Sequence, residues 1–292
     1  MQLPILATSD HLADWAGCVL VPTMGALHAG HAELIRLAAK HDSAVPIVVS
    51  IFVNPTQFGP GEDFERYPRT LDADLELVSN AGAAAVFVPD VATMYPDGYG
   101  ERDDASNAVV LPPVATQPRL EDAQRPGHFR GVAQVVARLF DLVQPRAAVF
   151  GEKDFQQLRM IEEMVAEARE RWGSGAGGLD IVRCPIVRDD DGLAMSSRNR
   201  FLSESSRAAA LGISRALLAA VELATPGRNA GRIEERMRAT LIRHHLEVDY
   251  AVVRAADTLL QIDAIEEHVP ARALIAARID GVRLIDNVAV GV

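Results

Sequence analysis

Residues 18–31 read CVLVPTMGALHAGH, and this stretch decides the fold. Its first four residues are apolar and predict a buried strand, which Pro22 is expected to end because it has no N–H to donate. Gly25 permits a tight turn close to a ligand. Helical spacing follows, so we predict a helix whose first turn carries His28 and His31 on one face. Such a helix start offers free N–H groups and the positive end of the helix dipole, which suit an anion.

Two histidines three positions apart also have a plainer explanation. They are most often a surface pair or half of a metal site, and a metal site would need at least a third ligand. A second stretch, MSSRN at residues 195–199, favours a different interpretation of the two histidines. Together the two stretches resemble the HIGH and KMSKS motifs of the nucleotidyltransferase superfamily, which favours nucleotide binding.

Composition narrows the class of protein. The chain has 292 residues, 49% hydrophobic and 24% charged, which predicts about two globular domains. A formal net charge of −11 argues against wrapping nucleic acid but leaves a small anionic substrate open. Cys18 and Cys184 lie in apolar runs and are expected to be buried thiols in a reduced compartment. With no signal-peptide pattern and no bilayer-length apolar run, we expect a soluble cytoplasmic protein.

The order of apolar runs predicts an α/β fold. Strand-like runs at residues 45–53, 84–88, 147–150 and 179–187 alternate with helices predicted at residues 70–80, 132–143 and 155–171. Beyond residue 203 the expected elements are helices at 205–224 and 230–245 and strands at 248–254, 273–279 and 283–290. We therefore predict a Rossmann-like parallel-sheet nucleotidyltransferase domain over residues 1–190. A smaller α+β C-terminal domain over residues 191–292 is expected to carry MSSRN at its start.

Polar residues collect where these strands should end, which is where open α/β sheets bind ligands. Asn54 and Gln57 follow one strand, although turn chemistry alone explains an Asn before a proline. Lys153 stands at a strand-to-helix turn, where an ammonium suits a phosphate.

Two further stretches are less decisive. Arg125, His128 and Arg130 form a basic cluster in a predicted loop, which faces either an anion or solvent. The glycine run at residues 173–178 lacks the Lys-Ser/Thr of a phosphate-binding loop.

Several segments together resemble the pantothenate synthetase family. They are VPTMGALHAGH (21–31), FVNPTQF (52–58), YPRT (67–70), MYP (94–96), RPGHFRGV (125–132), FGEKDFQQL (150–158) and DGLAMSSRN (191–199), with RLIDNVAV (283–290) in the C-terminal third. The resemblance implies that ATP adenylates the carboxylate of pantoate, releasing pyrophosphate, and that the amine of β-alanine then displaces AMP. This chemistry requires charge neutralisation at the phosphates and no covalent protein nucleophile.

The resemblance also implies roles for individual residues. The catalytic group would be His28, His31, Lys153 and Arg198, with His31 as proton donor. The ATP site would comprise Met24, Gly25, Ala26, Leu27, His28, Ala29, Gly30, His31, Gly151, Glu152, Lys153, Asp154, Val187, Met195, Ser196, Ser197 and Arg198. Pantoate would be bound by Gln57 and Gln157, with Gln57 also meeting β-alanine. Mg²⁺ would be coordinated by the phosphates, without a metal site made by the protein.

The sequence departs from the family pattern at one position, and the resemblance also implies an oligomeric state. Asp122 stands where the family usually has glycine, which adds a negative charge near a site for anions and leaves the role of Glu121 open. By resemblance we expect a homodimer formed through the N-terminal domain, with residues 52–54 as a guess for the contact.

Three other functions are weighed against this one. A related nucleotidyltransferase acting on a phosphate-bearing substrate would more often meet it with Arg or Lys than with Gln57 and Gln157. A catalytically dead nucleotide-binding module would be expected to lack one of His31, Lys153 and Arg198. An aminoacyl-tRNA synthetase would carry a basic tRNA-binding extension.

Overall fold

The computed structural model describes residues 3–59, 61–62, 64–98, 110–172 and 178–291. Residues 173–177 of the glycine run therefore lie outside the described part. The chain forms two compact units, the first comprising Met1–Ala115, Arg125–Glu152 and Gln157–Pro185, the second Thr116–Gln124, Lys153–Gln156 and Ile186–Val292. Two short segments from within the first 190 residues thus belong to the second unit, while the domain boundary after residue 190 stays a prediction.

A parallel sheet organises the first unit and confirms the Rossmann-like prediction. Its order is β1-β4-β3-β2-β5-β6, and every neighbouring pair is parallel. The strands are β1 (Ile5–Leu6), β2 (Val19–Thr23), β3 (Ile47–Ile51), β4 (Ala85–Phe87), β5 (Ala147–Gly151) and β6 (Asp180–Cys184). The two-residue β1, which pairs with β4 at the sheet edge, was not predicted because so short a run has no periodicity to recognise.

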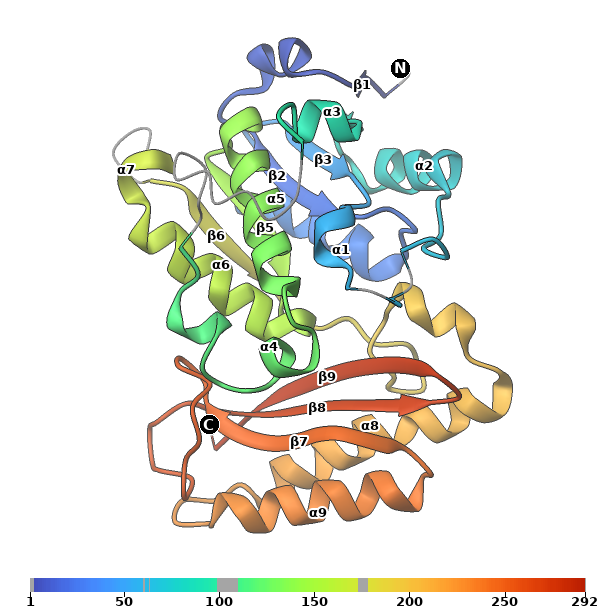
Figure 1. Cartoon of the computed structure of the whole chain (residues 1–292), viewed down its shortest axis with the longest axis vertical. Helices are drawn as coiled ribbons and strands as arrows, with labels where there is room; N and C mark the ends of the chain where they lie inside the picture. The colour runs from blue at the N-terminus through green and yellow to red at the C-terminus, as the bar shows by residue number, and fades with distance from the viewer. Residues whose placement is uncertain (1–2, 60, 63, 99–109, 173–177, 292) are drawn as a thin grey trace. The chain divides into compact units, whose positions relative to one another are not determined.

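Helices bury both faces of this sheet (Figure 1). The helical segments up to residue 185 are η1 (Ser9–Trp15), α1 (Ala29–His41), η2 (Pro55–Gln57), α2 (Leu71–Ala81), α3 (Val91–Met94), η3 (Pro113–Ala115), α4 (Glu121–Gln124), α5 (His128–Val143), η4 (Glu152–Asp154), α6 (Phe155–Glu167) and α7 (Arg169–Trp172). One face packs on α1 and α2 through residues such as Ile35 and Val78. On the other, Phe140 of α5 meets Phe150 of β5 edge to face, with ring centroids 6.4 Å apart. Burial on both faces explains the continuous apolar runs of the strands.

The prediction that Pro22 ends its strand was wrong. β2 continues to Thr23, and Pro22 pairs in register with Ser50 of β3. The N–H of Val19 and the carbonyl of Thr23 both bond toward β3, so alternation points Pro22 toward β5. Pairing with β5 ends at Leu20, so the missing N–H of Pro22 interrupts no ladder.

Two helix limits also differ from the predictions. The helix expected from residue 132 begins at His128, because Gly127, with φ of 83°, turns the chain directly into it. Gly131 therefore lies inside α5, where a Cβ would stand 2.2 Å from the carbonyl oxygen of Thr56, so only glycine permits α5 to approach η2 this closely. The helix expected over residues 155–171 is divided at Ala168 into α6 and α7.

The second unit confirms a small antiparallel sheet with two helices. Strands β7 (Glu247–Ala255), β8 (Ala271–Ile279) and β9 (Val282–Val290) lie in that order, and α8 (Glu204–Leu223) and α9 (Ala230–Arg243) cover one face (Figure 1). The predicted hairpin turn is present, with positive φ at Asp280 (48°) and Gly281 (77°). In the described part of the chain, no helix combines the length and apolarity needed to cross a membrane.

Candidate active site

The predicted residues of the first unit gather at one edge of its sheet. β3, β2 and β5 are neighbours and parallel, so their carboxyl ends lie side by side. The turn at residues 24–28 follows β2, and Gln57 lies in η2 just after β3. Gly151 ends β5, and Gln157 lies in the first turn of α6 beyond it. This is the edge at which open α/β sheets bind ligands.

His28 and His31 cap the start of α1 with their own rings. His28 Nδ1 accepts from the N–H of Gly30 at 3.1 Å, and His31 Nδ1 accepts from the N–H of His28 at 3.2 Å. The two ring centroids are 4.1 Å apart. Because both Nδ1 atoms accept from backbone N–H groups, the ring proton of each neutral imidazole resides on Nε2. Each histidine is therefore prepared as an Nε2–H donor at a helix N-terminus.

Asp74 holds the turn in front of these histidines. It is 2% exposed, and its carboxylate accepts from the N–H groups of Ala26 (2.9 Å) and Leu27 (2.8 Å) and from the hydroxyl of Thr70 (3.2 Å). A Cβ on Gly25 would lie 3.0 Å from this carboxylate. Glycine is therefore favoured at this position for two reasons, its φ of 78° and the close approach of Asp74. The local sequence does not indicate this contact, since the bond joins residues 48 positions apart.

Gln57 is buried behind the same edge. It is 8% exposed, its Nε2 donates to the sulfur of Met24 at 2.7 Å, and its Oε1 accepts from Asn54 Nδ2 at 3.3 Å. Asn54 does more than cap η2, since its Nδ2 also donates to the carbonyl of Gly131 at 3.1 Å, and its Oδ1 accepts from the hydroxyl of Tyr95 at 2.8 Å.

The basic cluster at residues 125–130 is largely built into the fold. Arg125 donates to both carboxylate oxygens of Glu62 (2.9 and 2.7 Å), and this guanidinium holds the pKa of Glu62 below its usual range although burial opposes the shift. His128 is buried, and its Nδ1 donates to the carbonyl of Gln57 at 2.8 Å. Arg125 and His128 therefore support the backbone at Gln57, which neither interpretation of this cluster anticipated, while Arg130 alone is exposed to solvent.

The second unit holds the other predicted residues on two segments. Lys153 and Asp154 lie in η4, with Lys153 Nζ 3.5 Å from Asp154 Oδ1. The chain at residues 187–195 forms a hairpin closed by the N–H of Met195 donating to the carbonyl of Val187 at 2.9 Å. Directly after it, Ser196 caps the short helix η5 (Ser197–Phe201), its hydroxyl accepting from the N–H of Arg198.

Asp122 adds no uncommitted charge. Its carboxylate accepts from the N–H groups of Arg119 (3.1 Å) and Leu120 (2.7 Å) and from Gln156 Nε2 (3.0 Å). Glu121 is buried and accepts from both terminal nitrogens of Arg283, each at 2.7 Å, and from the hydroxyl of Tyr250 at 2.7 Å. Glu121 therefore holds segment 116–124 on the sheet of the second unit, and Asp122 ties the same segment to Gln156.

Comparisons with known proteins agree with this arrangement. The family model described as pantoate-β-alanine ligase matches residues 6–289. The chain is 48% identical to pantothenate synthetase of Rubrobacter xylanophilus, covering 92% of this chain and 90% of that protein, and 46% identical to the one of Stenotrophomonas maltophilia, covering 96% of each. The chain belongs to the pantoate-β-alanine ligase family.

Solved structures of this ligase family share the fold. Pantothenate synthetase from Thermus thermophilus superposes with a TM-score of 0.86 at 40% identity, covering 98% of this chain and 99% of that one. The pantoate-β-alanine ligase of Francisella tularensis, solved in complex with β-γ ATP and β-alanine, has a TM-score of 0.74 at 29% identity, covering 98% of this chain and 97% of that one.

Residues 52–54 offer little side-chain surface for the predicted dimer contact, which stays a prediction, and of the three only Val53 is partly exposed. Phe52 and Asn54 are 7% and 1% exposed within the single chain, so their side chains are already covered. The rest of the contact surface would have to come from other residues of the unit.

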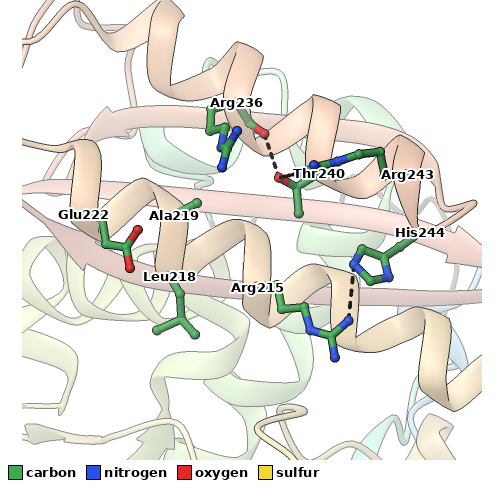
Figure 2. A pocket seen from close by; sticks show the side chains of 8 residues that line it. All are labelled: Arg215, Leu218, Ala219, Glu222, Arg236, Thr240, Arg243 and His244. Atoms are coloured by element: carbon green, nitrogen blue, oxygen red, sulfur yellow. Dashed lines mark hydrogen bonds between the residues drawn. The ribbon is translucent and has the colours of Figure 1, made fainter.

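A separate hollow of about 440 Å³ lies between α8 and α9 in the second unit of this ligase (Figure 2). Arg215, Arg236, Arg243 and His244 line it together with Glu222 and smaller residues. Arg215 NH1 lies 3.3 Å from His244 Nε2. A dashed line in Figure 2 marks this contact. None of the residues predicted to bind a substrate lines this hollow.

Proposed function

We propose that this protein condenses pantoate with β-alanine to pantothenate, with ATP as co-substrate, a pantoyl adenylate as intermediate, and AMP and pyrophosphate as products. The observation that carries the proposal is family membership along nearly the whole chain, from residue 6 to residue 289. The Francisella tularensis relative, crystallised with β-γ ATP and β-alanine, supports the choice of two of the substrates.

In the first unit, the turn from Met24 to His31 contacts ATP in this proposal. His28 and His31 donate through Nε2–H to the phosphate oxygens, where charge develops as the carboxylate of pantoate attacks the α-phosphorus. The support for this role is the double cap, which holds both rings in the tautomer that donates through Nε2. Gly151 and Glu152, at the end of a neighbouring strand, contribute further contacts to the nucleotide.

In the second unit, Lys153 and Arg198 supply positive charge to the phosphates, assisted by the hydroxyls of Ser196 and Ser197. Asp154, Val187 and Met195 complete the nucleotide contacts. Mg²⁺ enters with ATP and is held mainly by phosphate oxygens and water, the usual mode for this cation. Within the described residues no group of three or more His, Cys, Asp or Glu side chains is placed to hold a metal ion.

Pantoate selection falls to Gln57 and Gln157. An amide donates to a carboxylate and accepts from a hydroxyl without adding charge, so it recognises a hydroxy acid by shape and hydrogen bonding. A site built this way rejects analogues that lack the hydroxyl. The support for Gln57 is its place at the carboxyl edge of the sheet, where Asn54 and Met24 orient its amide.

The direct test supplies ATP, Mg²⁺ and pantoate, with and without β-alanine, and follows pyrophosphate and AMP. The proposal expects pyrophosphate from ATP and pantoate alone, and AMP release that depends on β-alanine. AMP or pyrophosphate formation that ignores pantoate would refute it.

A sharper test concerns the Nε2 donor of His31. In His31→Asn the amide oxygen replaces Nδ1 and can still accept from the N–H of His28, while the Nε2–H is lost. We expect pyrophosphate release to fall about 100- to 1,000-fold, the usual loss for one donor to a developing negative charge. His31→Gln, which restores a donor near the Nε2 position, is the matched control and should recover part of the rate. Near-normal rates in His31→Asn would remove His31 from the mechanism.

The acid pocket is tested with Gln57→Glu and Gln157→Glu, which keep the side-chain length but repel a carboxylate. Calorimetric titration should show pantoate affinity falling at least about 10-fold while ATP affinity changes little, because a neutral amide is replaced by a negative charge beside the carboxylate of pantoate. Loss of ATP affinity with unchanged pantoate affinity in both variants would contradict the assignment.

We also propose a cytoplasmic homodimer. Two buried free thiols suit a reduced compartment. Light scattering at micromolar concentration tests the dimer, and a monomer there would refute it.

A further inference from the structure

Asp286 and Asn287 are adjacent polar residues on β9 that the proposed reaction leaves without a role. They are 4% and 2% exposed, and they belong to the segment RLIDNVAV at residues 283–290. Because side chains alternate along a strand, the two point to opposite faces of the sheet. Strand β9 therefore makes polar contacts on both faces of the sheet at two adjacent residues.

Asn287 holds the segment that carries Lys153. Its Nδ2 donates to the carbonyl of Lys153 at 3.0 Å, and its Oδ1 accepts from Arg272 Nε at 2.6 Å, which fixes the orientation of the amide. Arg272 also stacks over Phe155, with its guanidinium carbon 3.8 Å from the ring centroid. The four-residue segment 153–156 is thus fixed at two points on the face formed by β8 and β9.

Asp286 holds the base of the hairpin that leads to MSSRN. Its carboxylate accepts from both terminal nitrogens of Arg188, at 2.6 and 3.0 Å, and from the N–H of Asn287 at 2.8 Å. Arg188 NH1 also donates to the carbonyl of Gly192 across the hairpin at 3.1 Å. Residues 196–198 follow this hairpin directly. The position of the hairpin therefore sets where the short helix η5, which carries Arg198, begins.

We propose that Asp286 and Asn287 are positioning residues for the adenylation step: Asn287 positions Lys153, and Asp286 positions the loop that carries Arg198. This inference rests on the proposed function. A two-point carboxylate–guanidinium pair and a fully bonded amide each specify one geometry, so both cation-bearing segments are aligned to the same strand. Small displacements of such groups are costly, since an error of about 1 Å lowers a rate on the order of 100-fold.

The decisive variant is Asn287→Asp. It keeps the shape and the acceptor for Arg272 but replaces the N–H donor to the carbonyl of Lys153 with an oxygen. We expect pyrophosphate release to fall about 10- to 100-fold with a raised KM for ATP, while the KM for pantoate changes less than about twofold. In a Lys153→Ala background the same change should cost nothing further, because its effect passes through Lys153. Asp286→Asn is tested in the same way: it should lower the rate of pyrophosphate release in the wild-type background and cost nothing further in an Arg198→Ala background.

Two controls separate positioning from general stability. Val288→Ala removes partly buried apolar contacts from the same strand, so it should lower the melting temperature but leave both KM values unchanged. Asn287→Ser, whose shorter side chain withdraws the donor from the carbonyl of Lys153 without burying a charge, replaces Asn287→Asp if that variant does not fold.

The outcomes are distinct. Wild-type protein that releases no pyrophosphate from ATP and pantoate would refute the proposed function itself. A second outcome would overturn this inference alone. In it the wild-type protein is active, but Asn287→Asp or Asn287→Ser lowers the rate of pyrophosphate release as much in the Lys153→Ala background as in the wild-type background. Wild-type kinetics in the folded Asn287 variant would overturn it equally.

Discussion

Replacing Asp74 by asparagine tests whether a distant helix holds the turn before His28. The carboxylate accepts from the N–H groups of Ala26 and Leu27 at 2.9 and 2.8 Å and is 2% exposed. An amide retains one acceptor oxygen and turns an NH₂ group toward the other N–H. Each bond to a charged acceptor contributes about 1.5–3 kcal/mol, so losing one of the two costs about 2–3 kcal/mol.

That loss should be visible in two assays. Calorimetry should show the melting temperature of the first unit falling by about 4–12 °C, at about 2–4 °C per kcal/mol for a domain of this size. Pyrophosphate release from ATP and pantoate should fall about 10-fold or more, because the turn that precedes the histidines loses its support.

Asp72→Asn is the matched control. Asp72 lies in the same first turn of α2 but is exposed, so its replacement removes only a helix-dipole interaction of about 0.3–1 kcal/mol. If Asp74→Asn is no less stable and no less active than Asp72→Asn, the carboxylate does not hold the turn and the reasoning fails.

Two further predictions concern groups whose pKa is shifted in the folded protein. Burial raises the pKa of Cys18 to about 12, and burial with nearby acidic charges raises that of Cys184 to about 11, so neither thiol should react with iodoacetamide at pH 8 until the protein is unfolded; mass spectrometry showing rapid alkylation of the native protein would contradict this. Burial and the charges of nearby basic residues, Arg215 first among them, lower the pKa of His244, so the folded state favours its neutral form; this contribution to stability is present above the pKa of the unfolded state and is lost as the pH falls from there through the lower pKa of the folded state. Arg215→Gln should raise the pKa of His244 in an NMR titration, and an unchanged value would show that this charge does not act on the ring.

The amino-acid sequence alone was sufficient to predict the class of fold and to single out the segments proposed to carry the chemistry. Short apolar runs rich in β-branched residues, alternating with helical segments, are typical of a parallel sheet covered on both faces, so β2 to β5 were predictable from the pattern, while the edge strand β6 is largely unburied. The glycine-rich turn, the histidine pair and MSSRN are local signals, because backbone conformation and charge at one point of the chain depend on adjacent residues. The hairpin at Asp280 and Gly281 was predictable for the same reason.

Only the tertiary structure decided which residues support that chemistry. Pro22 fits within β2 because the neighbouring strand stops pairing before it, a fact about β5 rather than about proline. Asp74 reaches the turn across 48 positions, and Asn287 reaches Lys153 across 134. Such contacts leave no trace in local spacing, since a buried polar group requires a partner but its own neighbours in sequence do not say which one.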